Sequence, residues 1–213
     1  METKVNGRLA TFWPRVSCHG LLQFLSNGSL RWMERACWIV GGSALSWCLL
    51  VYAEMFSFQA TGFQQFEAMR KTDAATPAVA PSGSLVAKIR IPGIGLSAVV
   101  VSGDDERILS RAVGHIPGTA SPDGIGTVGI AGHRDTFFRG LGRLRMNDEI
   151  FLETPSTTYR YQVAQTAVVE PSDIGVLGPH EYPSLVLVTC YPFSFVGHAP
   201  QRFIVTARRA ENE

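Results

Sequence analysis

The chain has 213 residues and a formal net charge of +1. This near neutrality argues against nucleic acid as a partner, because nucleic-acid-binding domains usually carry a strong positive field. The length suits one ordinary domain plus an appendage, and the scattered glycines and prolines favour many short strands over a helical bundle.

An uncharged segment, residues 36–53 (ACWIVGGSALSWCLLVYA), lies near the N-terminus. At about 1.5 Å per residue in a helix, this segment reaches about 27 Å, close to the hydrocarbon thickness of a bilayer. Trp32, Trp38 and Tyr52 lie near its ends, where interfacial aromatic residues gather. We therefore predict a transmembrane anchor over residues 36–56. A buried core helix is the alternative.

The charges around the segment predict its orientation. Residues 1–35 contain more basic than acidic residues, whereas charges just after the segment are few and balanced. The positive-inside rule then places residues 1–35 in the cytoplasm and the rest outside. A cleaved signal peptide is the rival interpretation, but a leader of about 35 residues is longer than its usual charged region. We expect a single-pass protein of the cell membrane with an extracytoplasmic domain.

The segment after the anchor, residues 57–84, is predicted to be an extracytoplasmic linker. Its first part, as far as Lys71, is amphipathic and fits a continuation of the helix. Residues 72–84 (TDAATPAVAPSGS) are rich in alanine, proline, serine and threonine, which indicates an extended linker without a core. The folded domain is therefore expected at residues 85–213.

Strand patterns dominate this outer domain. β-branched, partly alternating runs bounded by glycine and proline indicate strands, and two short runs fit helices. The predicted strands are residues 85–91, 97–103, 126–133, 148–154, 159–169, 184–190 and 202–209, and the predicted helices are residues 105–113 and 133–141. Seven or eight short strands joined by turns predict an all-β barrel or sandwich.

The four cysteines are unevenly distributed. Cys18, Cys37 and Cys48 lie in or before the predicted anchor, and Cys190 stands alone after it. No Cys/His spacing fits zinc and no obvious acidic cluster fits calcium, so we expect no metal and no cofactor. A lone thiol outside the cytoplasm is a liability unless it is buried or used.

Three reactive or charged residues are predicted to lie at strand ends, where they could form one active site. Cys190 ends the strand 184–190, His133 ends the strand 126–133, and Arg202 opens the strand 202–209. Because only a loop separates the last two strands, we expect them to be neighbours. Taken singly, each residue has an ordinary interpretation as a small core side chain, a loop histidine or a solvated arginine.

Together these three side chains can carry out acyl transfer. A thiolate is a nucleophile and needs positive surroundings. A histidine stabilises the thiolate as imidazolium and then gives its proton to a leaving amine. An arginine donates hydrogen bonds to substrate and to the oxyanion of a tetrahedral intermediate. Acyl transfer through a thioester is the reaction class that uses all three.

Three motifs carry a resemblance to a known family. The segment VLVTC, Val186 to Cys190, resembles the TLxTC motif of sortases, with Val186 where threonine is usual. AGHRDTFF is similar to the sortase segment that carries the histidine, and APQRFIV to the strand that carries the arginine. GHIPGTA and VTCYPFSFVGHAP look most like class D sortases. The resemblance covers residues 85–209, nearly the whole outer domain.

The resemblance implies an eight-stranded sortase β-barrel with short helices. It also implies a cysteine transpeptidase that cleaves an LPxTG-like sorting signal of a secreted protein and passes the acyl group to an amine, of a cell-wall precursor or a pilin lysine. By position, Cys190 matches the nucleophile, His133 the general acid and Arg202 the oxyanion or substrate-orienting residue. Thr189 matches the threonine before the cysteine and is expected to help hold substrate. His115 and His198 have no catalytic counterpart.

Two other functions remain as alternatives. One is another surface cysteine acyl-transferase or protease, such as an L,D-transpeptidase, in which histidine and cysteine lie close together as SHGC. Nothing like SHGC precedes Cys190, and His133 lies far from it in sequence. The other is a non-catalytic, membrane-anchored β-domain used in assembly, which predicts that Cys190 is buried and inert.

Overall fold

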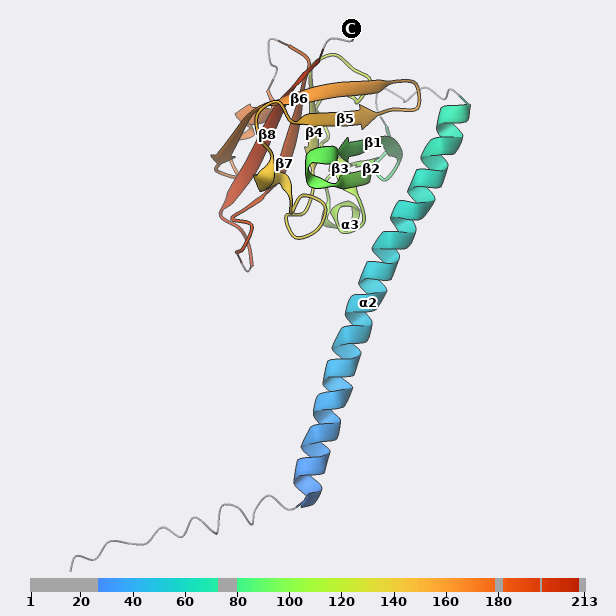
Figure 1. Ribbon diagram of the computed structural model, residues 1–213, viewed down its shortest axis with the longest axis vertical. Helices are drawn as coiled ribbons and strands as arrows, with labels where there is room; N and C mark the ends of the chain where they lie inside the picture. The colour runs from blue at the N-terminus through green and yellow to red at the C-terminus, as the bar shows by residue number, and fades with distance from the viewer. Residues whose placement is uncertain (1–26, 73–79, 179–181, 196, 211–213) are drawn as a thin grey trace, which may run out of the picture. The chain divides into compact units, whose positions relative to one another are not determined.

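The computed structural model describes residues 27–72, 80–178, 182–195 and 197–210 (Figure 1). The chain divides into two units, residues 1–50 and residues 51–213. A long helix, α2 (Asn27–Lys71), crosses this division, and all eight strands belong to the second unit. Cys18 and His19 lie outside the described residues.

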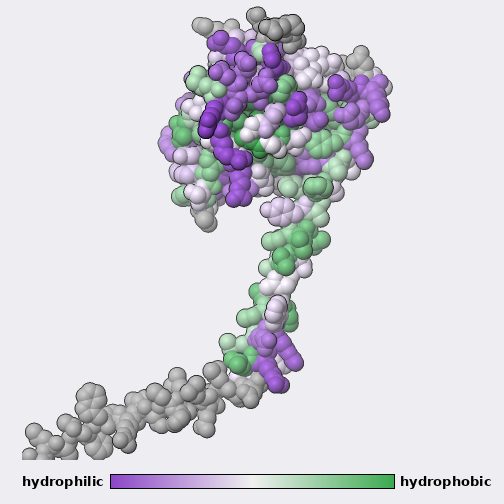
Figure 2. Space-filling model, in the orientation of Figure 1, coloured by the Kyte–Doolittle hydropathy of each residue, from purple (hydrophilic) through white to green (hydrophobic). Residues whose placement is uncertain are grey.

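The first part of α2 exposes its apolar side chains. Trp38 is 75% exposed, Ile39 71% and Trp47 70%, and Figure 2 shows hydrophobic residues along the helix. The helix is long and apolar enough to cross a membrane, and no residue of its most apolar stretch is buried. The alternative of a core helix is therefore wrong, because a core helix buries its apolar face. The finding is consistent with the predicted membrane anchor.

The eight strands close into a barrel in the order β1-β2-β3-β4-β7-β8-β6-β5. Alternate side chains point inward, and apolar runs at period two therefore fill the interior. The strands are β1 (Leu85–Ile91), β2 (Leu96–Ser102), β3 (Val113–His115), β4 (Thr127–Ala131), β5 (Glu149–Glu153), β6 (Thr158–Val169), β7 (Ser184–Tyr191) and β8 (Gln201–Arg209). The predicted all-β barrel is confirmed.

Short helical pieces join the strands. They are α3 (Glu106–Leu109) and the 3₁₀ helices η1 (Pro92–Ile94), η2 (Leu141–Arg143) and η3 (Ile174–Leu177). The helix predicted at residues 105–113 is shorter than expected, because the chain enters β3 at Val113. Asp105 caps its start, accepting a hydrogen bond from the Ile108 amide at 3.0 Å.

Residues 133–141, predicted as a helix, form a series of turns, so that prediction is wrong. Phe138 is fully buried in the barrel core, and its amide donates to the His133 carbonyl at 3.0 Å rather than closing a helical bond four residues back. A glycine follows at position 140, which weakens a helix further. The core position of Phe138 therefore overrides the local helical pattern.

β7 lies in the middle of the sheet, parallel to β4 on one side and antiparallel to β8 on the other. Leu185, Val186 and Leu187 are fully buried, as expected for a strand covered on both faces. In the same core, burial raises the pKa of Tyr161 to about 12, so its phenol stays neutral. The predicted central strand is confirmed, and it ends at Tyr191, one residue after Cys190.

The last turns of α2 pack against the barrel. Phe66 is fully buried, and Gly62 allows close approach to the Val99 side chain. The Gln59 side chain accepts a hydrogen bond from the Val99 amide at 3.0 Å and donates one to the Arg111 carbonyl at 2.7 Å. β3 pairs with β2 only from Val100 onward, so β3 offers no acceptor to the Val99 amide. Gln59 supplies that acceptor instead. The first part of the predicted linker thus continues the helix, as its amphipathic pattern indicated, and it packs against the barrel, which the pattern did not indicate.

We predict that Gln59→Leu lowers the free energy of unfolding by about 1–3 kcal/mol, because the buried Val99 amide loses its acceptor. Thermal unfolding of the full chain in detergent measures the effect. Gln64→Leu is the matched control, since Gln64 is exposed on the same helix. A loss no larger than that of the control would contradict the role of Gln59.

Candidate active site

A cavity of about 370 Å³ lies where β4 and β7 end and β8 begins, and Cys190, His133 and Arg202 all line it. Parallel strands end at the same edge of a sheet, which brings the ends of β4 and β7 together. β8 runs the other way and therefore begins at that edge. The topology gathers three residues from distant parts of the sequence into one cavity.

Cys190 and Arg202 face each other across the ladder of β7 and β8. Directly opposed residues of an antiparallel pair project on the same face of the sheet, so the thiol and the guanidinium share one side. The expectation that these strands are neighbours is confirmed. Cys190 is partly exposed and is a free cysteine.

His133 follows the end of β4 by two residues. The Gly132 amide continues the ladder by donating to the Val188 carbonyl at 3.1 Å. The His133 Nε2 atom lies 3.3 Å from a Glu106 carboxylate oxygen. Because Glu106 is 85% exposed, this contact is a solvated one of small energy. It nevertheless gives the imidazole a partner at the rim of the cavity.

Thr189 is buried, and its hydroxyl donates to the Gly132 carbonyl at 2.7 Å. This bond ties the end of β7 to the residue before His133, so it couples the positions of Cys190 and His133. Thr189 also lines the cavity. Donation to a substrate would require this bond to break, and the substrate-binding role of Thr189 stays a prediction.

The Arg202 guanidinium is held by its own loop. Nη1 donates to the Gln201 carbonyl at 3.0 Å and to the Ala199 carbonyl at 3.3 Å. A guanidinium has five N–H donors, so Nε and Nη2 retain three. Within the described part of the chain these atoms make no hydrogen bond. Arg202 can therefore keep its orientation and still donate into the cavity.

Arg134 clamps the loop between β7 and β8, a role that no pattern in the sequence indicates. It is only 7% exposed, and its guanidinium donates to the carbonyls of Pro192 (3.2 Å), Phe195 (2.6 Å) and Gly197 (2.9 Å). Asp135 lies 3.5 Å from its Nε atom. The sequence shows only that an arginine follows the candidate histidine. This position does not tell whether the arginine is buried or solvated.

Aromatic packing holds the other side of the same loop. Tyr191, Phe193 and Phe203 form a cluster with ring centroids 5.3–6.0 Å apart. Phe193 packs over Gly142, where an added Cβ would lie 2.7 Å from the ring. The loop that connects Cys190 to Arg202 is thus fixed by a charged clamp and by an aromatic cluster.

Four carboxylates also line the cavity, beside the guanidinium and the imidazole. They are Asp104, Glu106, Glu170 and Asp173. They come from two segments, residues 104–106 and residues 170–173, which only the fold brings together. Within the ranges that the structure describes, no three acidic, histidine or cysteine side chains are grouped closely enough to hold a metal ion.

The remaining histidines do not line this cavity where the structure describes them. His115 Nε2 lies 2.8 Å from the Ala120 carbonyl oxygen and 3.2 Å from the Thr119 hydroxyl, which indicates a structural contact. His198 is exposed. His180 lies outside the described residues.

Comparisons with known proteins identify the fold and the family. Residues 89–210 match the family described as the sortase domain. Sortase D of Bacillus subtilis is 37% identical over 122 residues, which cover 57% of this chain and 62% of that protein. The match therefore spans less than two thirds of that relative's length.

Two solved structures illustrate the similarity. A Sortase D5 transpeptidase of Clostridium perfringens has a TM-score of 0.62 and 27% identity, covering 75% of this chain and 99% of its own. Sortase E1 of Streptomyces coelicolor, solved with a tripeptide in its active site, has a TM-score of 0.56 and 30% identity, covering 61% and 90%. The family match extends over more than half of the sequence, and the chain belongs to the sortase family.

Proposed function

We propose that this protein is a membrane-anchored cysteine transpeptidase that cleaves an LPxTG-like sorting signal of secreted proteins. The observation that carries the proposal is the direct pairing of Cys190 with Arg202 at the sheet edge, in a cavity that His133 also lines. Membership of the sortase family supports the same reaction.

In the first half of the reaction, the Cys190 thiolate attacks the carbonyl carbon before the scissile bond. A sulfur–carbon bond forms, and the carbonyl oxygen becomes an oxyanion. The free N–H groups of Arg202 are suited to donate hydrogen bonds to that oxygen. The intermediate then collapses, the carbon–nitrogen bond breaks, and the His133 imidazolium gives its proton to the leaving amine. A thioester with Cys190 remains.

In the second half, an acceptor amine attacks the thioester. The neutral His133 imidazole takes a proton from the attacking nitrogen, an amide bond forms, and the bond to the Cys190 sulfur breaks. The thiolate and the imidazolium are thereby restored. The acceptor is an amine of a cell-wall precursor or a pilin lysine, as the family resemblance implies.

Arg134 is proposed to act as a positioning residue. It does not line the cavity, but it links the segment after His133 to the loop between Cys190 and Arg202. Hydrogen bonds from a charged donor are among the stronger ones in proteins. The loop therefore depends on a single guanidinium for three of its carbonyl contacts.

The proposed location is the cell membrane, with the N-terminus in the cytoplasm and the barrel outside. The exposed apolar part of α2 supports an anchor. The excess of basic residues before it supports this orientation. The proposed division of the chain is a cytoplasmic segment (1–35), an anchor (36–56), a linker (57–84) and a catalytic domain (85–213).

The non-catalytic alternative is less well supported. It requires an inert, buried thiol, whereas Cys190 is partly exposed and lines a cavity. Nothing like the SHGC motif of an L,D-transpeptidase precedes Cys190 in the sequence. The family match favours the sortase reaction over both.

Cys190→Ala should reduce transpeptidation of a peptide panel containing LPxTG-like motifs by about a thousandfold or more, because the nucleophile is lost. Mass spectrometry of the wild-type reaction should detect the peptide thioester, and the variant should show none. Cys48→Ala, in the predicted anchor, is the control. Activity retained in Cys190→Ala would refute the catalytic assignment.

Arg202→Lys should lower kcat by about a hundredfold, close to the effect of Arg202→Ala, because lysine lacks the planar fork that both holds the loop carbonyls and reaches the oxyanion. Steady-state kinetics on one peptide measure both variants. Full rescue by lysine would indicate that charge alone suffices.

Arg134→Met should lower kcat/KM by about tenfold or more through misplacement of the loop, while Cys190 still reacts with a small thiol reagent. Arg145→Met is the matched control, since Arg145 is exposed and nearby in sequence. Equal activity of the two variants would show that the clamp does not position the site.

A further inference from the structure

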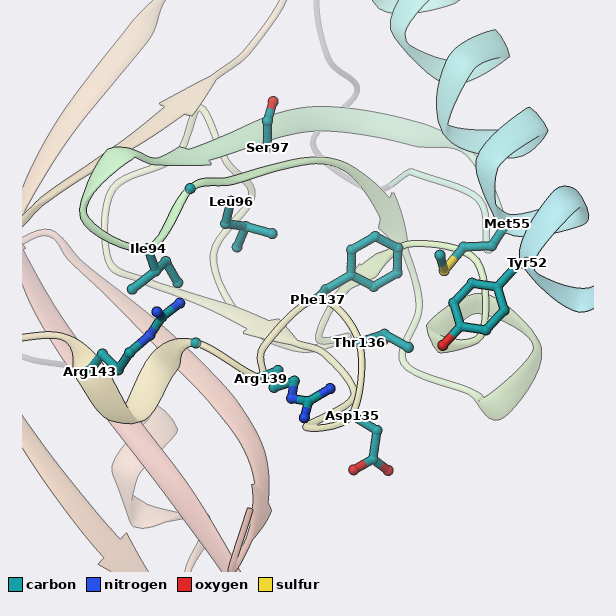
Figure 3. Close-up of a pocket in the computed structure, with 12 residues that line it drawn as sticks. Tyr52, Met55, Ile94, Leu96, Ser97, Asp135, Thr136, Phe137, Arg139 and Arg143 are labelled. Carbon is teal, nitrogen blue, oxygen red and sulfur yellow. The ribbon is translucent and has the colours of Figure 1, made fainter. Parts of the chain in front are cut away.

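A second cavity, of about 560 Å³, lies on the barrel beside the point where α2 leaves its apolar segment. Tyr52 and Met55 of α2 line it, together with two barrel segments, residues 94–97 and residues 135–143 (Figure 3). No residue lines both this cavity and the Cys190 cavity. The proposed catalytic reaction does not use it.

The cavity has a mixed lining, in which apolar side chains stand beside polar ones such as Ser97 and Thr136, and two arginines lie at its rim. Figure 3 shows Met55 pointing toward Phe137 and Tyr52 toward Thr136, with Ile94 and Leu96 from the barrel on the other side. Arg139 and Arg143 are exposed at the rim. The cavity therefore combines a surface for hydrocarbon with two guanidinium groups.

The two arginines are available for an anion. In the described residues neither Arg139 nor Arg143 makes an ion pair, whereas the one acidic lining residue, Asp135, lies 3.5 Å from Arg134. Guanidinium groups bind phosphate oxygens through paired hydrogen bonds. The uncompensated charge at the rim thus favours a phosphate.

The place of the cavity along the chain favours a lipid as the source of that phosphate. The uncharged segment ends at Ala53, between the two helix residues that line the cavity. At about 1.5 Å rise per residue, Tyr52 and Met55 lie within one helical turn of that end. A helix residue at this depth meets lipid headgroups, where tyrosine is favoured.

We propose that this cavity binds the headgroup of an anionic phospholipid, with the phosphate between Arg139 and Arg143 and the glyceride against Ile94, Leu96 and Phe137. Binding would hold residues 94–97 and 135–143 of the barrel at the membrane surface. The proposal rests on the anchoring of α2 and is independent of the catalytic assignment.

The test is native mass spectrometry of the full chain in neutral detergent, titrated with phosphatidylglycerol or with phosphatidylcholine. Wild-type protein should bind phosphatidylglycerol about fivefold or more tightly, since each arginine near an anionic surface contributes about that factor. Arg139→Gln/Arg143→Gln should lose this preference, with unchanged binding of phosphatidylcholine. Equal binding of the two lipids by wild-type protein would overturn the proposal.

The matched control is Lys71→Gln/Arg208→Gln, which removes two exposed positive charges that line neither cavity. It should keep the preference, and an equal loss would show that net charge alone attracts the lipid. Soluble glycerol phosphate should bind far more weakly than phosphatidylglycerol, and equal affinity would make the site one for a soluble phosphate compound. Cys190→Ala should bind lipid like wild-type protein, which separates this inference from the catalytic one.

Discussion

The pairing of β7 with a parallel strand on one side and an antiparallel strand on the other is the constraint on which the candidate site depends. Parallel β4 and β7 end together, and antiparallel β8 begins at the same edge. Cys190, His133 and Arg202 can therefore meet although they are distant in sequence. The buried run Leu185–Leu187 makes β7 rigid, because both of its faces are covered. A nucleophile at the end of such a strand has little freedom to leave its place.

Much of this arrangement could be predicted from the sequence. Apolar runs bounded by glycine and proline located seven of the eight strands, because a half-buried or fully buried strand leaves a clear pattern. β3 was missed because three residues, Val113–His115, are too few to show a period. The predicted helix at residues 133–141 failed because Phe138 enters the core, a long-range contact that local periodicity does not report.

The candidate site was predictable only in part, for a related reason. Cys190, His133 and Arg202 were chosen as residue types at strand ends, which the sequence shows. Arg134 was not, because its role depends on three carbonyl groups more than fifty residues away. The carboxylates of the cavity come from two segments, residues 104–106 and 170–173, and Gln59 acts on a strand forty residues further along. Contacts of this kind leave no local pattern.

The Arg134 clamp binds main-chain carbonyls, and in the described part of the loop it makes no hydrogen bond to a side chain. Its three acceptors are therefore present whatever amino acids occupy the loop, provided that the backbone keeps its course. Loop side chains that face away from the aromatic cluster are then free to diverge without loss of the support. Such a loop can change in sequence while the positions of Cys190 and Arg202 at its two ends stay the same.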